Sequence, residues 1–180
     1  MSGSERSVEA PPDTRVLLVG MMGAGKSTVG RALSAATAWP YVDNDECVVA
    51  ATGREAPDIL DADGEPALRR AESAALMHAL GIPPPVVAGV AGGVVLDAGD
   101  RARLAAGGFV VWLRARVETL VRRVGSGSGR AWLRPDPEAA LRRFSEARAS
   151  LYAEAATLVV DVDDASPEDI AAQIVDALSR

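Results

Sequence analysis

Residues 20–27 of the chain, GMMGAGKS, combine small residues with a lysine and a serine in a spacing suited to phosphate chemistry. They match the pattern G-x-x-x-x-G-K-[ST], in which glycines let successive backbone N–H groups point at phosphate oxygens. Lys26, the chain's one lysine, would contact the β- and γ-phosphates as a compact point charge, and the Ser27 hydroxyl would ligate Mg²⁺. An apolar run precedes the stretch and a helical pattern follows it, which adds a helix N-terminus. The pattern predicts nucleoside-triphosphate binding.

A pair of carboxylates follows the second apolar run, in the sequence DND at 43–45. In an extended segment, Asp43 and Asp45 would project to the same side, at the carboxyl edge of the sheet. One could hold Mg²⁺ through water, while the other accepts hydrogen bonds, or a proton, from an acceptor hydroxyl. The alternative is that the stretch only caps the next helix.

Arginines lie in two further stretches that could contact anions. In DGEPALRRAE (63–72), Arg69 or Arg70 could grip a carboxylate bidentately, although a solvated helix face explains them equally. GSGSG at 125–129 precedes Arg130, and its composition predicts a mobile loop that carries arginines. An ordinary linker between helices is the alternative there.

Composition excludes several classes of function. The net charge of −6 and pI near 4.9 oppose sequence-independent binding to nucleic acids or anionic membranes. Cys47 is the one cysteine, so no intramolecular disulfide can form, and no secretory leader is recognisable. The apolar run at 86–96 is far shorter than the roughly 20 residues that span a bilayer. We expect a cytoplasmic monomer without a nucleic-acid or membrane partner.

Short apolar runs alternate with helical patterns along the chain, which predicts an α/β domain with a parallel sheet. We expect a three-layer α/β/α fold around five strands, in one domain over 14–180, after a disordered tail at 1–13. The expected strands are 15–20, 41–43, 85–90, 109–113 and 157–162. The expected helices are about 26–37, 46–52, 65–80, 99–106, 117–124, 137–154 and 167–179.

A phosphate loop alone does not separate kinases from GTPases or ATPase motors. This loop lies near the N-terminus of a 180-residue chain with no N/T-K-x-D guanine-reading pattern and no appended motor domain. These features favour a small-molecule kinase, whose acceptor must be identified from the remaining charged residues.

From about Arg15 to Leu178 the chain resembles the shikimate kinase family. The resemblance rests on the order and spacing of several motifs: GMMGAGKSTVGRAL, DND, TGREAPDIL, DGEPALRRAE, a Gly-Gly segment after the third strand, a glycine-rich segment with an arginine, and EARASLY. It implies a P-loop kinase fold with a mobile lid at about 125–137. It also implies ATP- and Mg²⁺-dependent transfer of the γ-phosphoryl group to a hydroxyl of shikimate or a closely related carboxylated cyclitol.

The resemblance also implies a role for each matching residue. Asp45 would bind the acceptor's hydroxyls and act as the candidate base, while Asp43 would organise Mg²⁺ with Ser27. Arg69 and Arg148 would clamp the substrate carboxylate together with the backbone of Gly92, and Gly93 would also bind the substrate. Arg130 in the lid would cover the transferring phosphoryl group. The implied ATP-binding residues are Gly20, Gly23, Ala24, Gly25, Lys26, Ser27, Thr28, Arg130, and Arg123 with Pro167 beside the adenine.

Two stretches depart from the family pattern. The family usually carries three consecutive glycines after the third strand, but the chain has GVAGG at 89–93, with Ala91 first of the three. The lid begins RAWL at 130–133, where the family more often has an Arg-Pro pair. Two alternatives therefore stay open: a kinase for another polyol, such as gluconate or a different C7 cyclitol, and a nucleotide-binding protein without turnover.

Overall fold

The computed structural model describes residues 13–125 and 135–180. The tail expected at 1–13 lies almost wholly outside these ranges, and so does most of the lid expected at 125–137, including Arg130. Within the described ranges, no helix is long and apolar enough to cross a membrane.

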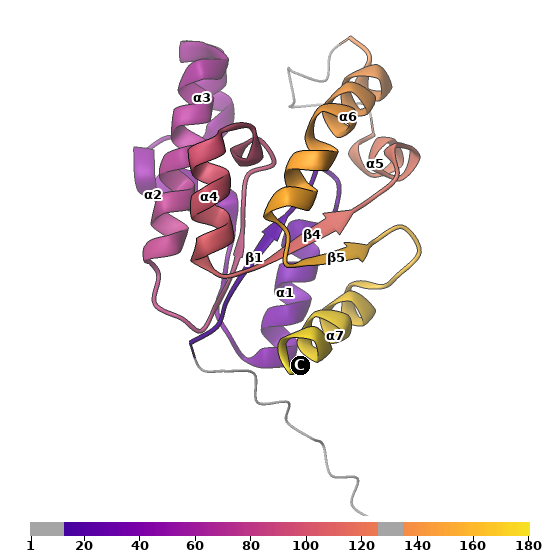
Figure 1. Ribbon diagram of the computed structural model, residues 1–180. Coiled ribbons are helices and arrows are strands. Elements are labelled where there is room, and N and C mark those ends of the chain that lie inside the picture. Colours follow the sequence, from indigo (N-terminus) through magenta and orange to yellow (C-terminus); the bar gives the residue numbers. More distant parts are fainter. Residues whose placement is uncertain (1–12, 126–134) are drawn as a thin grey trace, which may run out of the picture.

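A five-stranded parallel sheet forms the centre of the fold, as predicted, with strand order β2-β3-β1-β4-β5 (Figure 1). The strands are β1 (Arg15–Val19), β2 (Tyr41–Val42), β3 (Val86–Gly89), β4 (Phe109–Arg114) and β5 (Leu158–Asp161). The helices are α1 (Lys26–Thr37), α2 (Asn44–Thr52), α3 (Ala56–Gly81), α4 (Ala98–Gly107), α5 (Val117–Val124), α6 (Pro137–Ala155) and α7 (Pro167–Leu178), with a 3₁₀ turn, η1 (Val94–Leu96).

The helices cover both faces of the sheet. The connection from β1 to β2 runs toward one edge, whereas all later connections run toward the other. Because parallel crossovers are right-handed, α1 lies on one face and α3, α4 and α6 on the opposite face. Helix α7 packs beside α1, and α4 contacts both α3 and α6 (Figure 1). The three-layer arrangement matches the prediction.

The central strands are buried on both sides. Leu17 and Leu18 of β1, and Val110 and Val111 of β4, are fully shielded from solvent. Such continuous apolar runs suit strands covered by helices on two faces, which is why the sequence predicts them without a period-2 alternation. This core fixes the positions of the loops that leave the strands.

The described structure differs from the sequence prediction after β2 and before α3. Strand β2 ends at Val42, and α2 already begins at Asn44, so the DND stretch is not extended throughout. Helix α3 begins at Ala56, nine residues before the expected start, and is kinked at Gly64, where φ is +79°. Glycine tolerates that backbone conformation, and it lets two helical segments join into one element.

The direction of the chain connections reverses between β1 and β3. In open α/β sheets such a switch point leaves a crevice at the carboxyl ends of the strands, where ligands bind. The loop after β1 contains residues 20–25, and the loop after β3 contains residues 90–93. The topology therefore brings the glycine-rich loop and the Gly-Gly segment together.

Packing between α1 and β2 yields a stability prediction. Gly30 of α1 is buried, and a Cβ there would overlap the ring of Tyr41. Gly30→Ala should lower the free energy of unfolding by about 1–3 kcal/mol, because overpacking forces the ring or helix to shift. Urea denaturation measures this change. Gly81→Ala is the matched control: its Cβ would meet no atom within 4 Å, so its stability should be unchanged or slightly higher. Equal stability of Gly30→Ala and wild type would contradict the packing.

Candidate active site

The loop between β1 and α1 adopts backbone conformations that demand glycine. Gly20, Gly23 and Gly25 have φ of +147°, +81° and +97°. At Gly20 there is also no room for a side chain, because a Cβ would lie 2.7 Å from the carbonyl oxygen of Leu113. The glycines therefore have two roles, a tight turn and a close approach to β4.

Lys26 folds back over this loop. Its Nζ donates hydrogen bonds to the carbonyl oxygens of Gly20, at 2.9 Å, and Met21, at 3.3 Å. Gly25 is the N-cap of α1 and has no side chain that could cap the helix. First-turn N–H groups have no acceptor within a helix, so this end suits an anion. Thr28 is exposed in the same first turn, and Ala24 is buried beneath the loop.

Asp43 accepts hydrogen bonds from three directions. Its carboxylate receives the Ser27 hydroxyl at 2.6 Å, the Tyr41 hydroxyl at 2.8 Å and the backbone N–H of Asp45 at 3.1 Å. Partial burial by itself would raise the pKa of Asp43, but these hydrogen bonds favour the charged form and hold the pKa below its ordinary value. Asp43 is therefore an ionised carboxylate held against the phosphate loop. It also caps α2, which is what the alternative interpretation of the DND stretch predicts.

The Ser27–Asp43 pair fits one side of a Mg²⁺ site. Both groups offer hard oxygen ligands, and they lie at the start of α1 beside the loop. Among residues 13–125 and 135–180, no three His, Cys, Asp or Glu side chains form a cluster that could hold a metal. Magnesium commonly binds through one or two carboxylates and takes its other ligands from nucleotide phosphates and water. The donor set thus suits a nucleotide-borne ion.

Asp45 lies in the first turn of α2, and its side chain is exposed. The amide of Asn44 is 3.4 Å from its carboxylate. The same-side placement expected for an extended segment is replaced by a helical turn, because Asp43 caps the helix two residues earlier. Asp45 nevertheless remains one turn from the Ser27–Asp43 pair, since its N–H binds Asp43.

Arg69 is held by two carboxylates on its own helix. It pairs with Glu72 at 2.6 Å and with Glu65 at 2.8 Å. Burial raises the pKa of Glu72 despite the opposing charges of Arg69 and Arg148, whereas Glu65 is 68% exposed. The sequence reasoning did not select Glu72, although its spacing of three residues from Arg69 on a helix was the available signal. Arg70, the alternative to Arg69, is exposed.

Arg148 of α6 is a buried cation, only 5% exposed. Its guanidinium lies 4.8 Å from the ring centre of Phe144 and 3.4 Å from the carbonyl oxygen of Gly92. The hydroxyl of Tyr152 donates to the same carbonyl at 2.7 Å. A buried charge needs partners, and Arg148 has them in Phe144, in the Gly92 carbonyl and in the negative charge of nearby Glu72.

The Gly-Gly segment joins the two halves of the site. A Cβ at Gly92 would lie 3.0 Å from the carbonyl oxygen of Gly20, and a Cβ at Gly93 would overlap the guanidinium of Arg69. Ala91, where the family usually has a third glycine, is buried and does not require a positive φ. Arg69 and Arg148, here called the arginine cluster, are therefore in contact with the phosphate loop through Gly92 and Gly93, two residues without side chains.

Arg123 of α5 contacts the loop from the other side. It donates to the carbonyl oxygens of Gly23 and Ala24, each at 3.4 Å, and to that of Val162 at 2.7 Å. Pro167, its expected partner beside the adenine, is the first residue of α7 after the Ser166 capping box. Arg123 thus links the phosphate loop to the segment between β5 and α7.

Comparisons with known proteins point to one family. A family model described as shikimate kinase matches residues 22–179. A shikimate kinase of Streptomyces avermitilis is 42% identical over 164 residues, which cover 91% of this chain and 95% of that protein. A shikimate kinase of Pseudomonas entomophila is 41% identical over 166 residues, covering 92% and 96%.

Solved structures show the same relationship. A shikimate kinase from Acinetobacter baumannii in complex with shikimate matches with a TM-score of 0.86 and 31% identity, covering 92% of each chain. A gluconokinase from Sinorhizobium meliloti matches with a TM-score of 0.61 and 17% identity, over 94% of this chain and 93% of that one, which is a likeness of fold alone. The expected P-loop kinase fold is confirmed, and the chain belongs to the shikimate kinase family.

Proposed function

We propose that the chain catalyses ATP-dependent transfer of a phosphoryl group to a hydroxyl of shikimate. The observation that carries this proposal is the contact between two sites of different chemistry. Gly92 lies between the phosphate loop at Gly20 and the buried cation Arg148, and Gly93 lies against Arg69. A nucleotide's terminal phosphate and a carboxylated acceptor would thereby meet at the switch point of the sheet.

On the nucleotide side, the loop supplies positive charge and hydrogen-bond donors. The α1 N-terminus and the glycine-rich turn would receive the phosphate oxygens, and Lys26 would move its ammonium from loop carbonyls to the β- and γ-phosphates. Ser27 and Asp43 would hold Mg²⁺, which neutralises phosphate charge when bound. Arg123 and Pro167 would flank the base.

On the acceptor side, Arg69 and Arg148 would bind the substrate carboxylate. The Arg69–Glu65 pair is largely exposed and therefore weak, so an incoming carboxylate could replace Glu65 at little cost. Glu72 is largely shielded from solvent and would keep the guanidinium oriented during that exchange. Bidentate recognition of a carboxylate is what the planar guanidinium provides.

The transfer itself needs positioning and charge neutralisation more than covalent chemistry. The acceptor oxygen would form a bond to the γ-phosphorus as the bond from that phosphorus to the β-phosphate oxygen breaks. The hydroxyl proton would pass to the carboxylate of Asp45. Arg130, outside the described residues, would complete the charge and close the lid over the site, excluding water.

The proposal retains the monomer and the cytoplasmic location that the sequence led us to expect. Transfer to gluconate or another cyclitol, and nucleotide binding without turnover, are the competing functions. Ala91 has no positive φ, so its replacement of the family's usual glycine gives no structural reason to favour the non-enzymatic alternative.

The direct test measures ADP release from Mg-ATP with shikimate, with other carboxylated and uncharged cyclitols, and with gluconate. We expect shikimate to stimulate ADP release far more than any other compound. Uncharged cyclitols should be poor acceptors, because they leave two arginines without a carboxylate. If gluconate stimulated ADP release more strongly than shikimate, gluconate would be the acceptor. ATP binding without any phosphorylated product would support the non-enzymatic alternative.

Removing the Arg69 guanidinium should weaken acceptor binding selectively. Arg69→Ala should raise the KM for shikimate on the order of tenfold to a hundredfold, the effect of losing a charge-assisted hydrogen bond. The KM for ATP should change by less than about twofold. Arg70→Ala is the matched control, an exposed neighbour on the same helix, and should behave as wild type. An unchanged shikimate KM in Arg69→Ala would remove Arg69 from the acceptor site.

Tyr41→Phe should raise the pKa of Asp43, because it deletes one of the hydrogen bonds that favour the ionised carboxylate. Carboxyl-detected NMR titration measures this pKa directly. The stability contributed by ionised Asp43 is present above its unfolded pKa of about 3.9 and is lost as pH falls through the lower folded pKa. The variant should therefore lose less stability than wild type on acidification. Tyr152→Phe, whose hydroxyl does not touch Asp43, should leave the pKa of Asp43 unchanged. An unshifted Asp43 pKa in Tyr41→Phe would show that the Tyr41 hydrogen bond does not stabilise the ionised carboxylate.

A further inference from the structure

Helix α5 begins without a capping side chain of its own. Its N-cap residue is Arg116, which makes no side-chain cap hydrogen bond. Serine, threonine, asparagine and aspartate cap helices because their oxygens accept from first-turn N–H groups, and a guanidinium has no acceptor. The start of α5 therefore needs an acceptor from elsewhere in the chain.

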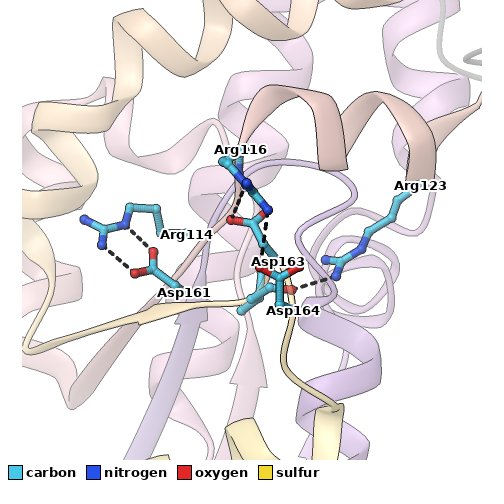
Figure 2. A network of polar contacts seen from close by, with 7 residues as sticks. Arg114, Arg116, Arg123, Asp161, Asp163 and Asp164 are labelled. Carbon is cyan, nitrogen blue, oxygen red and sulfur yellow. Dashed lines mark hydrogen bonds and ion pairs between the residues drawn. The ribbon is translucent and has the colours of Figure 1, made fainter.

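Asp163, in the segment between β5 and α7, supplies that acceptor (Figure 2). Its Oδ1 accepts the backbone N–H of the N-cap residue Arg116 at 3.0 Å, the donor that a capping box satisfies from within the helix. Thr119, buried in α5, lies near enough for its hydroxyl to favour the charged form of the carboxylate. The side chain of Asp163 is only 12% exposed, and its Oδ2 lies 3.3 Å from Nε of Arg116. Burial opposes the charge, but these donors outweigh it and lower the pKa of Asp163.

The far end of α5 lies against the phosphate loop. A Cβ at Gly23 would be 2.9 Å from the Val124 side chain and 3.4 Å from the Leu120 carbonyl oxygen. Arg123, from the same turn, donates to carbonyl oxygens of the loop and of Val162, the residue before Asp163. Any shift of α5 therefore displaces the loop that would hold the phosphates.

We propose that Asp163 is a positioning residue for nucleotide binding, which caps α5 from a neighbouring loop and so fixes Arg123 against the phosphate loop. It would touch neither nucleotide nor acceptor. The inference deepens the proposed function on its nucleotide side, and it rests on the assignment of the loop as the nucleotide site.

Neighbouring ion pairs do not share this role. Asp164 also pairs with Arg116, at 3.3 Å, but its side chain is 90% exposed and it receives no backbone N–H. Arg114 and Asp161 form an exposed pair at the ends of β4 and β5 (Figure 2). Exposed pairs contribute little, whereas a shielded carboxylate that satisfies a helix N-terminus contributes more.

The test measures the affinity for ADP by isothermal titration calorimetry, which requires no phosphoryl transfer. Asp163→Ala should raise the Kd for ADP by about fivefold to tenfold. This is the change expected if the free energy typical of a lost helix cap appears as weaker ADP binding at the phosphate loop. Asp163→Asn keeps an acceptor oxygen and should bind ADP nearly as wild type does. Asp164→Ala is the matched control, with an unchanged Kd. In steady-state assays with shikimate, Asp163→Ala should raise the KM for ATP but not that for shikimate.

A second variant separates capping from general loss of structure. Arg116→Ser places at the start of α5 an oxygen that can accept a first-turn N–H, a different donor from the one Asp163 binds but at the same helix end. Asp163→Ala combined with Arg116→Ser should therefore recover part of the ADP affinity. Wild-type affinity in Asp163→Ala, equal losses in Asp163→Ala and Asp164→Ala, or no recovery in the double variant would each overturn the proposal. Absence of turnover with shikimate would refute the proposed acceptor and leave this measurement valid.

Discussion

The carbonyl oxygen of Gly20 is the point on which the rest of the site depends. Lys26 donates to it at 2.9 Å, and Gly92 approaches it so closely that a Cβ would be only 3.0 Å away. The close approach is possible because β1 and β3 are adjacent parallel strands whose loops leave the same edge. A side chain at Gly92 would push the phosphate loop away from Arg148, and geometry at that scale decides whether two reactants meet.

Two carboxylates that are largely shielded from solvent orient the cations around this point. Glu72 holds Arg69, and Asp163 holds the start of the helix that carries Arg123. Glu72 acts on the proposed acceptor side of the site, and Asp163 acts on the proposed nucleotide side. The chain thus fixes its cations before any anion arrives, which lowers the ordering cost of binding.

Sequence patterns predict most of the fold, because buried apolar runs and helical periodicity are local features. Helix α1 and the strands β1 and β4 are predicted nearly to the residue for that reason. The start of α2 is missed because Asp43 serves at once as a cap and as a partner of Ser27. The contact of Asp163 with Arg116 spans 47 residues, so no periodicity encodes it. Residue types therefore indicate the site's chemistry, whereas the supporting contacts require the tertiary structure.

Lys26, the chain's one lysine beside 18 arginines, differs from Arg69 and Arg123 in what it must contact. Arg123 spans carbonyl oxygens of two separate segments, and Arg69 spans two carboxylates, tasks that suit a planar group with five donors. Lys26 instead lies within a single tight loop, where its donors reach Gly20 and Met21. Its compact ammonium can exchange those carbonyls for phosphate oxygens by rotating a flexible stem. A planar guanidinium lacks this compactness, so the phosphate loop is the place in the chain where lysine is better suited than arginine.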